Sequence, residues 1–318
     1  LHAPERSSIV PALPFTRITF MTRPYTPLYL AGQTGSGKTA VALALAAKLA
    51  PAEVINADAY QVYRGMETIS AAPDLEEKAL VPHHLFGVID PTEECDAASF
   101  AKLARAKIEE VSTRALPLVV GGSGLYLKAI THGLAPTPKG DPVLRAELDS
   151  LSFDELISRY RQLDPEGAGQ TNLKNRRYVT RNLEICLLTN TPASLIKQEW
   201  QDNQPDIRAY YLKRERDEVY QRINQRALLM FENGVTEEIR ALEKLSATAE
   251  KAIGIRVIQS HLAGEIDRET CISAIQQMTR RYAKRQESWF KREASFQPIP
   301  VAVNDSPDQI AEKILSAH

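Results

Sequence analysis

The segment Leu28–Leu49, LYLAGQTGSGKTAVALALAAKL, constrains the fold of this chain more than any other part of the sequence. A short apolar run comes first, then a match to the pattern G-x-x-x-x-G-K-[ST], then strong helix formers that end before Pro51. A strand, a glycine-rich loop and a helix in this order are typical of a phosphate-binding loop, or P-loop. The residues that we expect to bind a diphosphate are Gly32, Gln33, Thr34, Gly35, Ser36, Gly37, Lys38 and Thr39.

The chemistry of a P-loop follows from its residue types. Glycines let the backbone curl so that its N–H groups point inward, and the helix N-terminus adds partial positive charge. Lys38 supplies a full positive charge, and the hydroxyl of Thr39 can hold a Mg²⁺ ion that bridges two phosphates. The alternative is a glycine-rich turn before an alanine-rich helix, which the complete motif and its flanking elements disfavour. The loop does not identify its ligand, because a diphosphate on any carrier satisfies the same donors.

Length and composition limit the classes of protein to consider. With 318 residues the chain has room for two domains or for one domain with an insertion, and 39 Lys and Arg against 40 Asp and Glu leave it nearly neutral. Any polyanion would therefore have to bind at a local basic patch. Cys95, Cys186 and Cys271 lack C-x-x-C pairing, which argues against a zinc module or a disulfide framework and favours the cytoplasm. No apolar run approaches the roughly twenty residues of a membrane span.

The first residues of the chain contain many prolines and show little periodicity. We expect residues 1–26 to form a flexible leader, and this segment lacks the continuous apolar core of a secretory signal. Met21 stands just before the first expected strand. We therefore expect the functional protein to begin near Met21.

Strands and helices alternate after the P-loop. Glu53–Ala57 is expected to form a second strand, Leu85–Ile89 a third apolar segment, Ala97–Val111 a helix and Leu116–Val120 a buried strand. This alternation predicts an α/β fold, a P-loop NTPase-like parallel sheet wound with helices on both faces. No acidic pair follows Leu116–Val120, where an ATPase motor would ordinarily hold its magnesium ion. Motor-type hydrolysis is therefore disfavoured.

Asp58 directly follows the second expected strand. Ligands in open α/β sheets bind at the carboxyl ends of the strands, so this carboxylate is expected beside the P-loop. Three roles are about equally compatible with that position: a magnesium-side carboxylate, a general base, or the N-cap of a helix.

The composition changes between Leu134 and Pro205, where proline-rich sequence is followed by helical patterns. We expect residues 136–205 to form an inserted helical domain, with helices at Val143–Leu163 and Asn175–Leu188, and residues 27–135 and 206–318 to form the core. The basic residues of the second helix can share one face. A solvated surface is the default explanation for them, and a nucleic-acid contact is the alternative. These residues are Lys174, Arg176, Arg177 and Arg181.

The chain then returns to the core with an expected strand, Ala209–Leu212, and a helix, Asp217–Asn233. Arg222 and Arg226 lie one turn apart on this helix, so both can face one anion. A basic, turn-like stretch at Lys251–Arg256 follows.

A long cationic helix is expected at Glu269–Glu293. It contains Trp289 and Phe290 together with a run of basic residues, a composition that suits contact with a folded RNA backbone. Core packing of the aromatic rings, with the cations in solvent, explains the same residues equally well. The basic residues are Arg280, Arg281, Lys284, Arg285, Lys291 and Arg292.

An ordered set of motifs resembles the bacterial tRNA dimethylallyltransferases. In sequence order they are GQTGSGKT, INADAYQVYRGM, VPHHLFGVIDP, PLVVGGSGLYLKA, RRYVTRNLEI, RINQRALLMFENGVTEEI, KAIGIR and TRRYAKRQESWF. The similarity extends from about Pro27 to Arg292, and its specificity rests on the ordered set, since the P-loop motif alone fits many proteins. The resemblance implies a P-loop sheet with an inserted helical domain that clamps the anticodon stem-loop of tRNA. It also implies binding of tRNA and dimethylallyl diphosphate and a need for Mg²⁺. We expect the protein to be a monomer.

The activity implied is transfer of the dimethylallyl group to the exocyclic N6 of adenosine 37, with release of diphosphate. An adenine amino group is a poor nucleophile, so a base that accepts its proton helps, and Asp58 matches the family's strand-end aspartate. Lys38, Thr39 with Mg²⁺, and Arg226 would stabilise the leaving diphosphate. The resemblance assigns tRNA contacts to Asp58, Ala59, Tyr60, Gln61, Ser123, Arg145, Arg177, Tyr178, Val179, Thr180, Arg181, Lys251, Ala252, Ile253, Gly254, Ile255 and Arg256.

Some positions depart from the family pattern. Gln33 stands in place of a proline and Ala59 in place of a serine, ISAAP at Ile69–Pro73 replaces a typical GTAKP, and NLKN at Asn172–Asn175 replaces HPND. None of these changes affects Lys38, the base or Arg226, so we expect activity to survive.

Two other classes share part of the pattern. A small-molecule kinase or an isopentenyltransferase of free adenylate would share the P-loop and the strand-end acid, but would not need the basic insertion. A non-catalytic RNA-binding protein would not need Asp58 opposite an intact P-loop.

Overall fold

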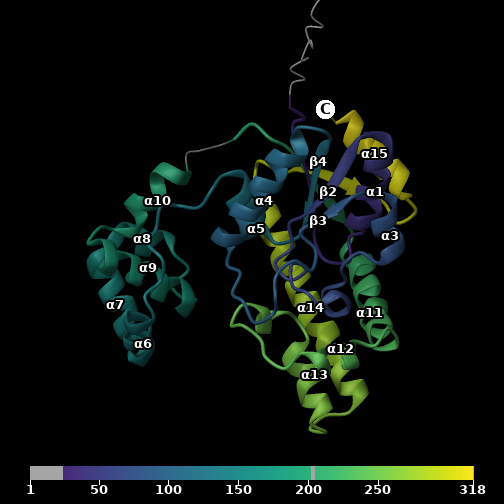
Figure 1. Ribbon diagram of the computed structural model, residues 1–318. Helices are drawn as coiled ribbons and strands as arrows, with labels where there is room; N and C mark the ends of the chain where they lie inside the picture. Colours follow the sequence, from purple (N-terminus) through teal and green to yellow (C-terminus); the bar gives the residue numbers. More distant parts are fainter. Residues whose placement is uncertain (1–23, 202–204, 318) are drawn as a thin grey trace, which may run out of the picture.

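The computed structural model describes residues 24–201 and 205–317. Most of the expected leader, residues 1–26, and Met21 lie outside the described residues. The described part contains a sheet-based core and a separate cluster of helices (Figure 1). None of the described helices combines the length and the apolar character needed to cross a membrane. Cys95, Cys186 and Cys271 are buried free thiols.

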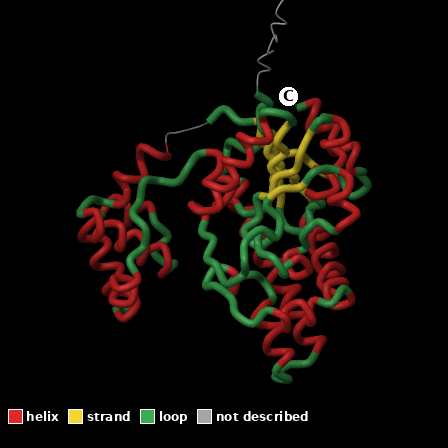
Figure 2. The backbone as a smooth tube through the Cα atoms, viewed as in Figure 1, coloured by secondary structure: helices red, strands yellow, loops and turns green. Residues whose placement is uncertain are grey.

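The core is built on a six-stranded parallel sheet, so the predicted α/β fold is confirmed (Figure 2). The strand order is β3-β2-β4-β1-β5-β6, which places the strand of the P-loop near the middle. The central strands are uninterrupted apolar runs because helices cover both faces of the sheet. The strands are β1 (Leu28–Gly32), β2 (Ala52–Asn56), β3 (His83–His84), β4 (Leu116–Gly121), β5 (Arg208–Arg214) and β6 (Gln297–Val301).

Helices pack on each face of the sheet, and a further group lies beyond the carboxyl ends of the strands (Figure 1). One face packs against α1 (Lys38–Lys48) and α15 (Pro307–Ser316), and the other against α4 (Ala97–Ser112) and α5 (Gly124–Thr131). The group near the strand ends is α11 (Arg216–Glu232), α12 (Val235–Ala241), a 3-10 turn (Ala249–Lys251), α13 (Ile255–Leu262) and α14 (Arg268–Phe290). The short helices α2 (Glu67–Ser70) and α3 (Leu75–Leu80) complete the core.

The inserted segment is helical and has its own hydrophobic core, which includes Leu156, Tyr160 and Leu183. Its helices are α6 (Pro142–Ser150), α7 (Phe153–Leu163), α8 (Pro165–Gln170), α9 (Arg176–Thr189) and α10 (Ala193–Gln201). The single helix predicted at Val143–Leu163 was wrong. The chain leaves the helix at Leu151, and Ser152 starts a new one by forming a capping box with Glu155.

Two further segments need comment, because Leu85–Ile89 was expected only as an apolar segment and no element was expected at Gln297–Val301. The segment Leu85–Ile89 is not a strand, because Leu85 adopts a left-handed backbone conformation with φ of 65° and Ile89 forms only an isolated bridge with Tyr63. Strand β6, with the sequence QPIPV, was missed because two prolines disfavour a strand. They are tolerated because β6 is an edge strand that pairs with β5 alone.

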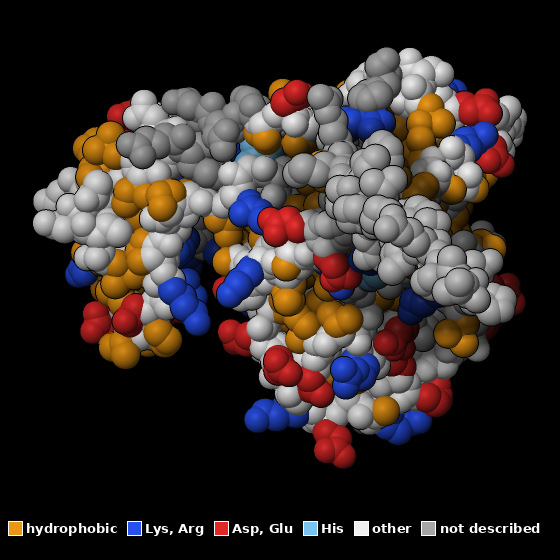
Figure 3. All heavy atoms as spheres, turned by 45° about the horizontal axis from the view of Figure 1, so that its top comes forward, with side chains coloured by type: hydrophobic (Ala, Val, Ile, Leu, Met, Phe, Trp, Pro, Cys, Tyr) orange, Lys and Arg blue, Asp and Glu red, His pale blue; other side chains and the backbone are white. Residues whose placement is uncertain are grey.

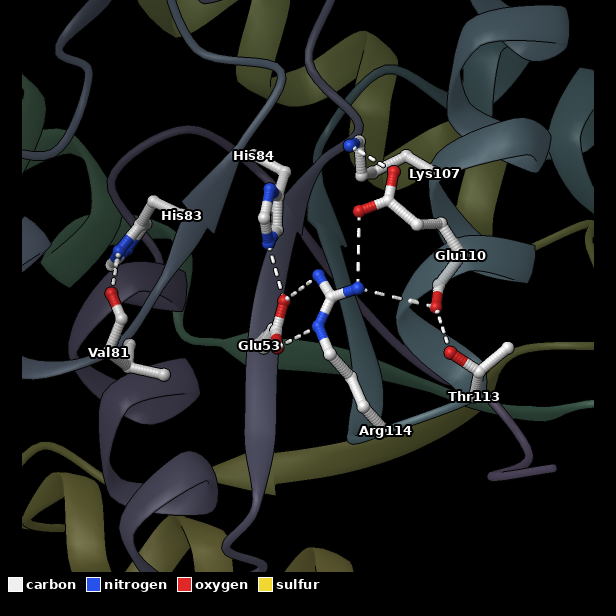
Figure 4. Close-up of polar contacts among 8 residues, drawn as sticks. All are labelled: Glu53, Val81, His83, His84, Lys107, Glu110, Thr113 and Arg114. Atoms are coloured by element: carbon white, nitrogen blue, oxygen red, sulfur yellow. Dashed lines mark hydrogen bonds and ion pairs between the residues drawn. The ribbon is translucent and has the colours of Figure 1, made fainter. Parts of the chain in front are cut away.

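A network of charged side chains connects β2 and β3, at one edge of the sheet, to α4 and the residues that follow it (Figure 4). Glu53 of β2 is buried, and its carboxylate accepts two hydrogen bonds from Arg114, at 2.8 and 2.9 Å. His84 of β3 lies 2.6 Å from the same carboxylate, while Arg114 also pairs with Glu110 of α4. The hydrogen bonds that Arg114 donates have the largest effect on the pKa of Glu53, and they lower it. Burial raises the pKa and the hydrogen bond to His84 lowers it, so that the pKa lies below its ordinary value.

Glu53→Gln is expected to lower the free energy of unfolding by about 1–3 kcal/mol near pH 7, because an amide cannot replace a carboxylate that accepts charged donors. Since the folded pKa of Glu53 is lowered, its contribution is fully present above the unfolded pKa and is lost as pH falls through the folded pKa. Denaturant unfolding of both proteins across this acidic range measures the effect. Glu110→Gln, which changes the exposed end of the network, should lower the free energy of unfolding by less than Glu53→Gln does. Parallel pH profiles for wild type and Glu53→Gln would refute the assignment.

Candidate active site

The loop between β1 and α1 has the backbone geometry of a P-loop. Gly35 and Gly37 have φ values of 80° and 87°, a left-handed conformation that side chains disfavour. A Cβ atom on Gly32 would lie 2.5 Å from Ser36 Oγ, so only glycine fits there. Ser36 Oγ is itself buried and has no hydrogen-bond partner among the described residues. The loop is therefore a tight cradle with an unused polar group.

Lys38 lies at the start of α1, and its ammonium group donates a 3.2 Å hydrogen bond to the Gln33 carbonyl. Burial lowers the pKa of Lys38 to about 8; the nearby Asp58 carboxylate opposes this shift and Arg226 adds to it. A bound anion would favour the charged form of the lysine.

Arginines from β5 and α11 surround the loop. Arg222 donates to the Gly35 carbonyl at 2.9 Å, Arg226 donates to the Thr34 hydroxyl, and Arg214 donates to the Ser36 carbonyl at 3.3 Å. Arg222 and Arg226 line one cavity with the P-loop, as their spacing on the helix led us to expect. Burial lowers the pKa of Arg226, and the Asp58 carboxylate opposes that shift. The site thus concentrates cations where a diphosphate would lie.

Asp58 is held in a turn just after β2. Its amide donates to Asn56 Oδ1 at 2.7 Å, and its carboxylate accepts from the Tyr60 amide at 3.1 Å. No helix begins here, so the helix N-cap alternative for Asp58 was wrong. Asn56, which also bonds the Leu85 carbonyl at 3.0 Å, was missed by sequence reasoning. A polar residue ending an otherwise apolar strand was the available signal.

A cavity of about 570 Å³ connects the cradle to Asp58, which is within the usual size range of ligand sites. Its lining includes cationic side chains as well as the apolar side chains of Leu229, Met230 and Ile275. The cavity brings together many of the expected site residues. Those that line it are Thr34, Gly35, Gly37, Lys38, Thr39, Asp58, Tyr60, Gln61, Arg226, Ala252 and Ile253.

Other residues near Asp58 shape the loops around the cavity. Ser123 Oγ accepts from the Ala59 amide and contacts the Tyr282 hydroxyl, each at 3.3 Å. The Gln61 amide group donates to the Ala71 carbonyl at 2.8 Å and so caps the end of α2. Burial, followed by the charge of Asp58, raises the pKa of Tyr60 and of Tyr282. Both phenols are therefore neutral hydrogen-bonding groups beside the carboxylate.

Two expected basic residues of the insert bind an internal carboxylate. Glu184 is fully buried and accepts from Arg145 at 2.9 Å, from Arg181, and from the Asp141 amide at 2.8 Å. Arg181 also donates to the Pro138 carbonyl at 2.6 Å, which ties the linker before α6 to α9. Arg145 and Arg181 therefore stabilise the fold of the insert through these contacts.

The remaining residues of the basic segment differ in exposure. Arg176 donates to the Leu151 carbonyl at 2.7 Å, whereas Lys174 and Arg177 are exposed. Tyr178 is exposed, Val179 is buried in the insert core, and Thr180 Oγ1 is a buried hydroxyl with no hydrogen-bond partner within the described ranges. Lys174, just before α9, and Arg177 within it are thus the cations of this segment that are open to a large partner.

The stretch Lys251–Arg256 lies beside the cavity. Its two cations are exposed, and Arg256 pairs with Glu250 at 3.2 Å. Gly254 has a φ of 103°, and an added Cβ would lie 3.0 Å from Ile69. Ile255 is fully buried, so its side chain belongs to the core.

In helix α14 the aromatic residues pack inward. Phe290 stacks on Tyr211 with ring centroids 4.6 Å apart, and Trp289 packs edge-on against Phe290. The core-packing alternative therefore accounts for the aromatic residues. The cations Arg281, Lys284, Arg285, Lys291 and Arg292 are exposed, which leaves the RNA-contact hypothesis open for them.

The fold and the site define a P-loop protein in which a phosphate cradle and a strand-end carboxylate share one cavity. Residues 61–293 match the model of a family described as IPP transferase. A tRNA dimethylallyltransferase of Akkermansia muciniphila is 43% identical over 91% of this chain and 98% of its own length, and tRNA dimethylallyltransferase 1 of Citrifermentans bemidjiense is 38% identical over 84% and 89%. The chain therefore belongs to the IPP transferase family.

Solved structures agree with this placement. A tRNA isopentenylpyrophosphate transferase of Bacillus halodurans superposes with a TM-score of 0.66 at 32% identity, covering 92% of this chain and 99% of that one. A eukaryotic dimethylallyltransferase acting on tRNA gives a TM-score of 0.75 at 25% identity, covering 92% and 78%. The similarity includes both the core and the helical insertion, since it spans nearly the whole chain.

The titration of Lys38 gives a pH test of the cradle. We expect diphosphate to bind the charged form of Lys38, so affinity for inorganic diphosphate should fall as pH rises through about 8, by up to about tenfold per pH unit above that value. Calorimetric titration between about pH 7 and pH 9 measures this. Lys38→Met, which has no titrating group there, supplies the pH dependence of the ligand alone and should bind weakly throughout. Identical pH dependence of wild type and Lys38→Met would contradict the lowered pKa.

Proposed function

We propose that this protein transfers a dimethylallyl group from dimethylallyl diphosphate to N6 of adenosine 37 in tRNA and releases diphosphate. The observation that carries the proposal is the cavity, which joins the cations of the P-loop to apolar side chains and to Asp58. A short hydrocarbon attached to a diphosphate has the same two-part character. The names of the relatives point to the same reaction.

In the proposed reaction, N6 attacks the carbon that carries the diphosphate. The new C–N bond forms as the C–O bond breaks, the bonding electron pair leaves on the diphosphate oxygen, and Asp58 accepts the proton from N6. Lys38 and Arg226 would stabilise the charge that develops on the diphosphate. The target adenine must leave its stack to enter the cavity, at a cost of a few kcal/mol that backbone contacts would offset.

The residues present fit a magnesium ion bound together with the donor. Mg²⁺ commonly takes one or two protein oxygens and completes its shell with phosphate oxygens and water. The described residues hold no cluster of three or more His, Cys, Asp or Glu side chains suited to a metal, so the protein alone would not hold the ion. Thr39 lines the cavity within the phosphate cradle and would provide its hydroxyl. The ion would neutralise negative charge on the diphosphate.

The helical insert is proposed to hold the anticodon stem-loop against the core, with the protein acting as a monomer in the cytoplasm. In Figure 3 the insert stands beside the core, and Lys and Arg side chains lie along the sides that face each other. Arg177 of α9 and the exposed cations of α14 add positive charge to the surfaces of the insert and the core. A folded, polyanionic RNA suits such a surface.

One assay separates the proposal from its rivals. The protein is incubated with unmodified tRNA, Mg²⁺ and either labelled dimethylallyl diphosphate or labelled ATP. Prenyl label on tRNA supports the proposal, label on free AMP would indicate an adenylate isopentenyltransferase, and label leaving ATP would indicate a kinase. No transfer of either label, with tRNA still bound, would indicate a non-catalytic RNA-binding protein.

Asp58→Asn is expected to lower turnover by about 10²- to 10⁴-fold with little change in affinity for tRNA. The amide keeps an oxygen that accepts from the Tyr60 backbone, so the turn is retained, but it cannot accept a proton. Single-turnover assays near pH 7, where Lys38 is charged, measure the effect. Asp90→Asn, which removes a surface carboxylate bonded to Thr92, is the matched control. Near-normal turnover of Asp58→Asn would eliminate it as the base.

Arg177 and Arg181 of α9 should behave differently when removed. Arg177→Ala should weaken tRNA binding and reduce the slope of affinity against salt by about one charge, with unfolding unchanged. Arg181→Ala should lower the free energy of unfolding by about 1–3 kcal/mol, since it removes a donor from buried Glu184. Adding Glu184→Gln should recover part of that loss. An unchanged salt slope in Arg177→Ala would mean that this arginine is only solvated.

A further inference from the structure

Gln286 of α14 joins two loops of the active site that are distant in sequence. Its side-chain oxygen accepts from the Thr34 amide of the P-loop at 2.9 Å, and its side-chain nitrogen donates to the Gly122 carbonyl after β4 at 2.8 Å. The side chain is 5% exposed, and its bond to Gly122 is buried while its bond to Thr34 is partly buried. A Cβ atom on Gly122 would lie 2.5 Å from the Gln286 nitrogen, which shows how closely the two segments approach.

These bonds act on the part of the P-loop that Arg226 also contacts. The amide of Thr34 is held by Gln286, while its hydroxyl accepts a hydrogen bond from Arg226. Thr34 is therefore held from two sides, and the bond from its hydroxyl links Gln286 to the Arg226 guanidinium. Groups that are already oriented stabilise developing charge without reorganising, so a fixed Thr34 favours binding of an anion.

Helix α14 has two chemically different sides. Thr279, Tyr282 and Gln286 follow helical spacing on the inner side, where the first two line the cavity and the third bonds the P-loop. Arg281 and Lys284 lie on the exposed side. The same helix thus carries surface cations and supports the phosphate cradle.

We propose that Gln286 is a positioning residue for the donor: its two hydrogen bonds hold Thr34, and through it Arg226, in the orientation that binds the diphosphate. The proposal deepens the function proposed above and rests on it for the identity of the donor. Inorganic diphosphate is the probe, so cradle binding is measured without prenyl transfer.

The test is Gln286→Met in the full-length protein. Methionine is similar in length but provides neither hydrogen bond, so affinity for inorganic diphosphate in the presence of Mg²⁺ should fall about tenfold. The KM for dimethylallyl diphosphate should rise with it, while tRNA affinity and its salt slope stay unchanged. Asparagine is one methylene too short to reach both partners, so Gln286→Asn should show the same loss of diphosphate affinity. This variant replaces Gln286→Met in the test if the methionine variant does not fold.

The matched control is Gln276→Met on the same helix. Gln276 donates to the Asn224 carbonyl of α11 at 3.1 Å, so its loss also removes a hydrogen bond that anchors α14. Binding is compared at a temperature at which thermal unfolding shows all variants folded. Loss of diphosphate affinity in Gln286→Met but not in Gln276→Met supports the proposal, even if wild type proves unable to transfer a prenyl group. Equal losses in both, or wild-type affinity in Gln286→Met, would overturn it.

Discussion

The hydrogen bonds that align β2, β4 and β1 in parallel register determine where the reactive groups lie. Asn56 pairs with Val120, and Val120 pairs with Leu30, so these three residues form one row across the sheet. Two residues further along each strand, the chain reaches Asp58, Gly122 and Gly32. Because carboxyl ends of parallel strands meet at one edge, a carboxylate and a phosphate cradle become neighbours without any direct bond between them. The active site is a consequence of sheet register.

Much of this arrangement was predictable because its signals are local. The P-loop is a contiguous motif, and Asp58 follows a recognisable apolar strand, so both could be placed at the same sheet edge from sequence alone. The pairing of Arg222 and Arg226 follows from helical spacing. The break between α6 and α7 was also predictable, since Ser152 and Glu155 have the spacing of a capping box. The prediction of one helix over residues 143–163 relied on the longer amphipathic pattern and did not use this local signal.

What sequence reasoning missed depends on contacts between distant segments. Gln286 reaches Thr34 across most of the chain. Glu184 is the single acid of α9, and it binds Arg181 of the same helix together with Arg145 of α6. Nothing in a linear pattern distinguishes an arginine that binds a buried carboxylate from one that faces solvent. The left-handed conformation of Leu85 is similarly set by tertiary packing, since its side chain is buried in the core. The sequence shows which residues are charged, but only the fold determines which of them face solvent and which bind another residue of the protein.

Contacts that are made only in the fold also explain why the departures from the family pattern leave the site intact. At Gln33 the cradle uses the backbone carbonyl, which accepts from Ser36 and Lys38 and would be present in a proline as well. The Ala59 amide still bonds Ser123 without a side-chain hydroxyl. Segment 67–71 is held at one end by Glu238, which accepts from the amides of Thr68 and Ile69, and at the other end by Gln61. These positions are maintained by backbone groups and neighbouring side chains, which supports the expectation that activity survives these substitutions.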